Sequence, residues 1–204
     1  MRAFLLAVAL AATLTPARQA TPLSHQLELE IDPLAPRWNG SLRTELRVHQ
    51  SLTRLSLALT GVLPSRVEVS DARGKVDALW AVRSDRLVIE PRRALAPGRA
   101  VLAIEFDGEW GADGHGLQRE GAGRATRVIA HLGGGEAARV FPCWPDDPPT
   151  RWRLDIHTPA GWAVRAGGCV PVAHESQGRW WTSVFKSRTA MRASALTLAV
   201  TPRR

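Results

Sequence analysis

The segment His25-Gln26-Leu27-Glu28-Leu29-Glu30-Ile31 alternates apolar and polar side chains without interruption. Successive side chains of a β-strand point to opposite faces. The pattern therefore places Leu27, Leu29 and Ile31 on one face and the glutamates on the other, which predicts a half-buried strand.

The same alternation recurs along most of the chain, with glycine, proline and aspartate between the runs. Further strands are expected at 40–48, 55–59, 66–69, 79–89, 101–106, 151–157, 162–164, 179–185 and 195–200. Short strands at this spacing are typical of an all-β domain, an antiparallel β-sandwich or a barrel-like sheet. The glycine-rich segment 107–135 predicts a long connection, and 135–140 a short helix. With no repeat or internal boundary, residues 21–204 are expected to form a single domain.

Residues 1–20 have the organisation of a secretory signal peptide. Arg2 precedes an apolar run at 3–14, and the small residues Ala17 and Ala20 follow Thr15-Pro16. A membrane span needs about 20 apolar residues, so this run is too short to be one. We expect export to a periplasm or the cell exterior, without a membrane span. A short buried N-terminal helix is the alternative.

Composition excludes several classes of protein. The 204 residues suit one ordinary domain, and the formal charge is +8, with 27 Lys and Arg against 19 Asp and Glu. The arginines are dispersed among acidic residues, whereas a nucleic-acid-binding protein would gather them on one face. We therefore expect no nucleic-acid partner. The histidines are scattered, with no pair at helical metal-binding spacing.

Two cysteines and two adjacent tryptophans are the residues with open interpretations. In an oxidising compartment Cys143 and Cys169 can form a disulfide, but two buried thiols suit the sequence equally well. Trp180 and Trp181 must point to opposite faces of a strand, so at least one could lie exposed and bind a sugar ring or a protein. The alternative is that most of the eight tryptophans fill the core.

Residues 136–148 carry the most informative motif. They read Glu-Ala-Ala-Arg-Val-Phe-Pro-Cys-Trp-Pro-Asp-Asp-Pro, which resembles the segment D-A-R-x-x-F-P-C-[FW]-D-E-P in the N-terminal domain of aminopeptidase N-type (gluzincin) zinc aminopeptidases. Phe106-Asp107-Gly108 is similar to that family's F-x-G, and residues 116–119 to its G-L-Y-R. The matching motif positions are Phe141, Pro142, Cys143, Trp144, Asp146, Asp147 and Pro148. We expect a structural role for them, since Phe141, Cys143 and Trp144 are good core residues.

The resemblance implies a saddle-like β-domain that covers a separate catalytic domain. Catalysis in that family needs the helical H-E-x-x-H, which binds zinc, and the strand G-x-M-E-N. Neither occurs before Arg204, and Gly133 and His131 occupy the positions where the family carries a Gln or Glu that reaches the substrate amine. We expect no catalytic residue, metal ligand or cofactor in this chain, and zinc only if a catalytic partner supplies it.

Three functions follow from these observations. The first is an exported, non-catalytic binding or scaffold domain that docks on a separately encoded catalytic peptidase domain or a peptide. The second is an accessory subunit or fragment of a split zinc metallo-aminopeptidase, whose activity would be that of the family. The third is a carbohydrate- or surface-binding β-sandwich.

Overall fold

The computed structural model describes residues 19–111, 114–146 and 148–203, and within them the chain is almost entirely β-structure. The all-β prediction is confirmed. In this part of the chain no helix is long and apolar enough to cross a membrane. The predicted signal peptide lies mostly outside the described residues and stays a prediction. The first strand already begins at Ala20.

The strands form three sheets. The eight-stranded sheet has the order β13(Cys169–Gln177), β14(Trp180–Ser187), β11(Arg151–Pro159), β1(Ala20–Glu30), β2(Arg37–Val48), β8(Gly98–Glu109), β4(Val62–Asp71), β5(Gly74–Val76). The four-stranded sheet has the order β12(Trp162–Gly167), β15(Thr197–Pro202), β10(Arg127–His131), β9(Gln118–Glu120). The three-stranded sheet has the order β3(Leu55–Ala58), β7(Arg86–Pro91), β6(Ala78–Arg83).

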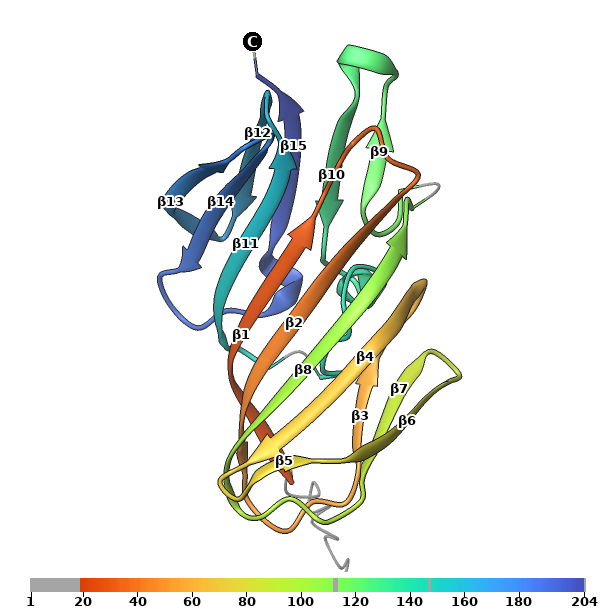
Figure 1. The fold of residues 1–204 in the computed structure, drawn as a ribbon, viewed down its shortest axis with the longest axis vertical. Coiled ribbons are helices and arrows are strands. Elements are labelled where there is room, and N and C mark those ends of the chain that lie inside the picture. The colour runs from red at the N-terminus through yellow and green to blue at the C-terminus, as the bar shows by residue number, and fades with distance from the viewer. Residues whose placement is uncertain (1–18, 112–113, 147, 204) are drawn as a thin grey trace, which may run out of the picture.

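Figure 1 shows the large sheet running along the body, with the four-stranded sheet at one end and the three-stranded sheet at the other. The core lies between the large sheet and the two smaller ones. Leu27, Leu29 and Ile31 are at most 2% exposed, as their alternation predicts. Every strand pair is antiparallel except β1 with β11, which run parallel with Leu27 opposite Leu154.

Three local expectations differ from the structure. The predicted long connection 107–135 contains β9 and β10, because β10 gains its partners from β15, far along the chain. The expected helix at 135–140 is a single 3₁₀ turn, Glu136–Arg139. Strand β13 carries almost no buried side chain, so it has no alternating pattern, and it exists through its pairing with β14.

Gly108 leaves room for the largest side chain of the core. It lies opposite Trp38 in the β2–β8 ladder, and a Cβ at Gly108 would overlap the indole ring. Trp38 is 2% exposed, stands edge-on to Phe106 at 6.2 Å between centroids, and donates its indole N–H to the Glu109 carbonyl at 3.1 Å. The glycine of the F-x-G motif is thus required by the packing of Trp38.

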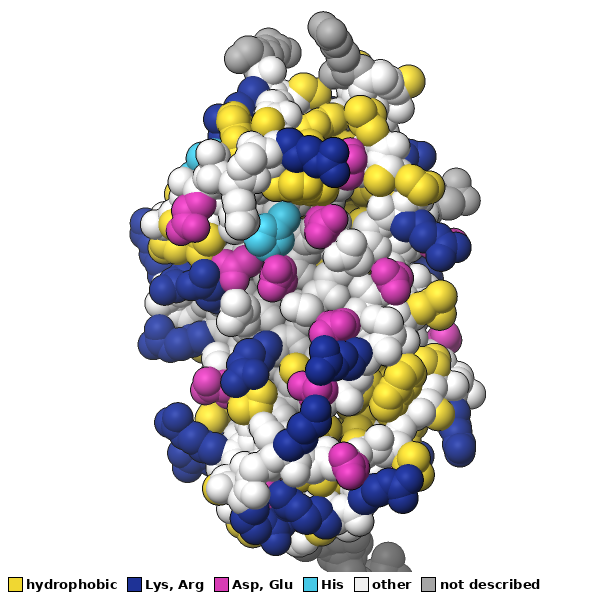
Figure 2. All heavy atoms as spheres, in the orientation of Figure 1, with side chains coloured by type: hydrophobic (Ala, Val, Ile, Leu, Met, Phe, Trp, Pro, Cys, Tyr) yellow, Lys and Arg dark blue, Asp and Glu magenta, His cyan; other side chains and the backbone are white. Residues whose placement is uncertain are grey.

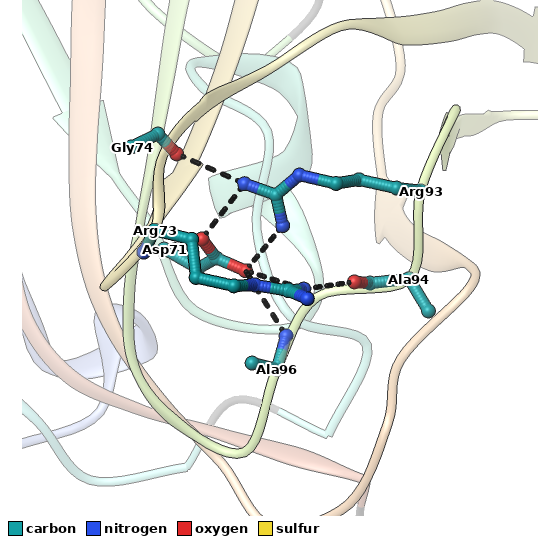
Figure 3. Close-up of polar contacts among 6 residues, drawn as sticks. All are labelled: Asp71, Arg73, Gly74, Arg93, Ala94 and Ala96. Atoms are coloured by element: carbon teal, nitrogen blue, oxygen red, sulfur yellow. Dashed lines mark hydrogen bonds and ion pairs between the residues drawn. The ribbon is translucent and has the colours of Figure 1, made fainter.

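A second fixed point lies where β4 turns into β5 (Figure 3). The carboxylate of Asp71, 1% exposed, accepts a bidentate pair of bonds from Arg93 at 2.7 and 2.9 Å. It also accepts the backbone N–H groups of Arg73 at 2.9 Å and Ala96 at 3.0 Å. The Arg93 guanidinium, followed by these backbone bonds, holds the pKa of Asp71 far below its usual range. This carboxylate ties the β4–β5 turn to the loop before β8.

We predict that Gly108→Ala destabilises the fold by about 1–3 kcal/mol, because the added methyl group displaces Trp38 from its place in the core. Thermal and urea unfolding measure the effect. Gly133→Ala is the matched control, since a Cβ there meets only the Ser194 carbonyl at an ordinary 3.6 Å. Equal stability of the two variants would contradict this account of the motif glycine.

We predict that Asp71→Asn lowers the free energy of unfolding by about 2 kcal/mol at neutral pH, through loss of charge-assisted bonds. Because the folded-state pKa is depressed, the wild-type advantage is present above the ordinary Asp pKa of about 3.9 and is lost as the pH falls below it. Urea unfolding at several pH values tests this, with exposed Asp107→Asn as the control. A difference between Asp71→Asn and wild type that stays constant into strong acid would argue against it.

Candidate functional site

The first part of the motif segment, residues 141–143, packs inside the fold and links two of its sheets. Phe141 is fully buried, with its ring 5.5 Å from that of Trp152, and Pro142 is buried beside it. Cys143 forms an isolated bridge with Ala58 of β3, with N···O distances of 2.7 and 3.0 Å. The segment thereby connects the three-stranded sheet to the core.

The end of the motif reaches the surface. Trp144 is half-buried against the core and Asp146 is exposed, whereas Pro148 is buried again. Asp147 lies outside the described residues. The described part of this segment therefore presents the Asp146 carboxylate to solvent.

His25 occupies an aromatic site next to the motif. It is 7% exposed, shares a hydrogen bond of 2.8 Å between its Nδ1 and Thr44 Oγ1, and lies 4.4 Å from the ring of Trp152 and 6.1 Å from that of Trp144. Sequence analysis gave this residue no role, although its position in an alternating strand implied that it faces inward with Leu27. Aromatic rings and one hydroxyl surround it, which suits a packed imidazole.

The potential zinc ligands of the described residues lie apart from one another. A zinc ion needs at least three nitrogen, sulfur or carboxylate ligands around one point. No group of three or more His, Cys, Asp or Glu residues within the described ranges could hold a metal ion. The histidines instead contact separate partners: His157 lies 2.9 Å from Glu28, His115 3.0 Å from Glu136, and His49 2.9 Å from Thr21.

Both cysteines are half-buried thiols in the structure. Cys143 belongs to the motif segment, and Cys169 begins β13 opposite Ser187. Burial raises the pKa of the Cys169 thiol, which lowers its thiolate fraction and its reactivity. In this structure the two cysteines are thiols. A disulfide between Cys143 and Cys169 under oxidising conditions stays a prediction.

Trp180 and Trp181 point to opposite faces of β14 and are both half-buried. The guanidinium of Arg203 lies over the Trp181 ring, 3.8 Å from its centroid, and His174 stands edge-on to the same ring at 5.2 Å. Arg203 also donates to His174 Nε2 at 2.8 Å, and His174 Nδ1 lies 3.1 Å from Ser183 Oγ. One face of Trp181 is thus already covered by a cation, which leaves less of the ring for a sugar.

The outer face of the four-stranded sheet brings together arginines that the sequence separates. A hollow of about 690 Å³ on this face is lined by Ala125, Arg127, Arg165, Ala199, Thr201, Pro202 and Arg203. The register places Arg165 beside Ala199, and the small residues Ala125, Ala199 and Thr201 lie between the arginines. Arg127 is paired with Glu120 at 2.6 Å, whereas exposed Arg165 forms no ion pair with any described residue. Sequence analysis missed this cluster, since its members come from β10, β12 and the end of β15.

The outer face of the large sheet carries charge in bands instead (Figure 2). Glu28, Glu30, Glu105 and Asp107 surround a polar hollow of about 440 Å³. A neighbouring hollow of about 280 Å³ is lined by Arg43, Arg151, Arg153 and Lys186 along with Glu45. The two bands face solvent, and several members are already paired, such as Arg153 with Asp155 at 2.9 Å.

Comparison with solved structures finds M1 zinc metallopeptidases. A structure of the M1 zinc metallopeptidase from Deinococcus radiodurans, in a mutant form, superposes with a TM-score of 0.75 at 21% identity, over 91% of this chain and 43% of that one. A two-domain M1 zinc metallopeptidase mutant bound to L-arginine matches with a TM-score of 0.75 at 20% identity and the same coverage. The form bound to L-tryptophan gives 0.74 at 20% identity. A comparison with curated proteins finds no match.

These structural likenesses establish the fold, and the chain spans about 43% of the length of the first of them. The matching region is the β-structure described above, with its large saddle of strands and two smaller sheets. A family model decides the membership. It describes the peptidase M1 N-terminal domain and matches residues 21–192, which is most of the chain. The chain belongs to the family of peptidase M1 N-terminal domains.

Proposed function

We propose that this chain is a non-catalytic scaffold domain that docks, through the outer face of its four-stranded sheet, on the catalytic domain of an M1-type zinc peptidase. The observation that carries the proposal is the arginine-rimmed hollow, whose lining includes the small side chains of Ala199 and Thr201. Small side chains on a sheet face let another element approach the backbone closely, and the arginines around it favour an acidic partner.

The family comparison supports this choice of partner. The first matching structures are two-domain M1 zinc metallopeptidases, and this chain corresponds to less than half of their length. In this proposal the catalytic zinc and its ligands come from the other domain, and the sequence supplies no H-E-x-x-H for them. Export before assembly is part of the proposal and rests on residues 1–20.

The alternative of a split zinc aminopeptidase shares this docking surface and differs in what assembly does. In that case the complex would cleave peptides, whereas a scaffold alone would leave the partner's activity unchanged. A reading frame encoding H-E-x-x-H directly beyond this one would favour the split enzyme. The carbohydrate-binding alternative has less support, because Arg203 already covers one face of Trp181.

We predict that the purified chain cleaves no aminoacyl-arylamide substrate and binds less than one equivalent of zinc. The physical reason is that its histidines contact separate partners and cannot converge on one ion. Fluorescent substrate assays with and without a chelator, together with elemental analysis, measure this. Chelator-sensitive cleavage by clean protein would refute the non-catalytic assignment.

We predict that Arg165→Glu weakens binding to a catalytic partner about tenfold or more. The change replaces the unpaired cation of the hollow with a negative charge, which an acidic partner surface would repel. The partner is identified by pull-down from native extract and mass spectrometry, and its affinity is measured by calorimetry at two salt concentrations. Arg99→Glu, an exposed change on the large sheet, is the matched control. A partner without H-E-x-x-H, or equal loss in both variants, would count against the proposal.

A further inference from the structure

Strand β6 is an edge strand with an unusual surface. It is the last strand of the three-stranded sheet, beside β7 only, and lies at the opposite end of the body from β12 and β15 (Figure 1). Its middle residues are Leu79, Trp80, Ala81 and Val82, of which Leu79, Trp80 and Val82 are 57%, 38% and 47% exposed. Exposed edges in soluble proteins are normally protected by lysine, proline, bulges or covering loops. The middle of β6 has no charged residue or proline.

The backbone geometry shows which groups of β6 are available. Ser84 and Asp85 have φ of 45° and 59°, which identifies the two-residue type I′ turn that joins β6 to β7. In such a hairpin the backbones of Arg83 and Arg86 exchange hydrogen bonds, and hydrogen-bonded pairs then recur at every second residue of β6. The bond from Arg92 N to Asp77 O fits this alternation, because Asp77 is six residues before Arg83. The amides of residues 79, 81 and 83 therefore face β7. Those of Ala78, Trp80 and Val82 face away from the sheet, where no other strand of the described part of the chain pairs with them.

The two ends of this edge carry opposite charges. Asp77 precedes the strand and Arg83 ends it; both are exposed, and neither forms an ion pair with another described residue. An apolar strand with an acidic start and a basic end is complementary to itself when turned antiparallel. This charge pattern suits a two-fold symmetric contact. In such a contact the acidic end of each copy lies opposite the basic end of the other copy.

The direction of the free backbone groups and the positions of the two charges together select one register for a β6–β6 pair. Outward-facing residues must oppose outward-facing residues, so the pairing has to match even-numbered residues with even-numbered ones. With Trp80 opposite Trp80 of a second copy, Ala78 lies opposite Val82, and Asp77 lies opposite Arg83 at both ends. If one β6 strand slides along the other by two residues in either direction, Asp77 no longer lies opposite Arg83 at either end. One register alone therefore satisfies backbone bonding and charge.

The side chains favour the same contact. Trp80 and Val82 lie opposite Ile89 and Leu87 in the β6–β7 ladder, and both of these are fully buried. All four thus share the core-facing side of the sheet, with Trp80 and Val82 extending beyond the edge of the core. Pairing two copies would continue the apolar layer from one molecule into the next.

We propose that β6 pairs antiparallel with β6 of a second copy of this chain, centred on Trp80, to form a two-fold symmetric dimer with a continuous six-stranded sheet. The contact is short and falls among small interfaces, so the dimer exchanges with monomer on dilution. It uses a different surface from the docking face and does not depend on the proposed function.

The test is the mass of the purified chain under reducing conditions, measured by sedimentation equilibrium across a wide concentration range. We expect the mass to rise from 22.2 kDa, or that of the processed chain, toward twice that value. Asp77→Arg and Arg83→Asp should each weaken dimerisation about tenfold, because each places like charges opposite one another at both ends. The double variant D77R/R83D should restore it. Val82→Lys should abolish it, whereas Leu34→Lys, on an exposed apolar residue in the β1–β2 turn, should not.

Circular dichroism and thermal unfolding confirm that each variant is folded. A chain that is monomeric at all concentrations would overturn the proposal. A dimer that ignores Val82→Lys, or is lost in Leu34→Lys, would place the contact elsewhere and overturn it too. Failure of D77R/R83D to recover affinity would refute the register, and a dimer that disappears only with reductant would be a disulfide product.

Discussion

The parallel pairing of β1 with β11 is the constraint on which the rest of the structure depends. It places residues 24–30 beside 151–157 through seven consecutive register pairs, in the middle of the eight-stranded sheet. Leu27 meets Leu154 and Leu29 meets Ile156, all of them buried, and the Gln26 amide donates to Asp155 at 2.8 Å across the same pair. Parallel strands need a long crossover. Here the chain between them contains four other strands of the large sheet, the whole three-stranded sheet, β9 and β10 of the four-stranded sheet, and the motif segment. Breaking this ladder would separate the β2–β8–β4 half of the large sheet from the β11–β14–β13 half.

The β1–β11 ladder fixes where the two smaller sheets lie. It therefore also fixes the outer face of the four-stranded sheet and the β6 edge of the three-stranded sheet. Both smaller sheets cover the inner side of the large sheet, so each has one apolar face in the core and one face or edge toward solvent. The four-stranded sheet presents small residues among arginines, and the three-stranded sheet presents an apolar edge. Because they lie at opposite ends of the body, the proposed catalytic partner and the proposed second copy would contact different parts of the molecule. Phe141 and Cys143 of the motif segment contact β11 and β3, so the segment connects these regions.

Much of the fold could be predicted from local patterns, and little of the candidate site could. The alternation at 25–31 placed Leu27, Leu29 and Ile31 correctly, and the glycine of F-x-G proved to be a packing requirement of Trp38. Arg127, Arg165 and Arg203 looked dispersed in the sequence, because nothing local indicates that β10, β12 and β15 are neighbours. Strands β9, β10 and β13 were missed for a related reason, since they are short or polar and form through pairing with distant partners. Trp181 could be assigned to a strand, but its contact with Arg203 could not be foreseen.

The sequence by itself indicated an all-β domain that resembles this family and which side of most strands is buried. It also showed that H-E-x-x-H and G-x-M-E-N are absent from the 204 residues. These properties depend on a period of two residues and on short motifs, which are local. Only the tertiary structure decided that one strand pair is parallel, that three arginines surround one hollow, and that β6 is an unprotected edge. Those features depend on hydrogen bonds and contacts between residues far apart in the chain, and the entropy of closing such loops is offset only when the whole core assembles.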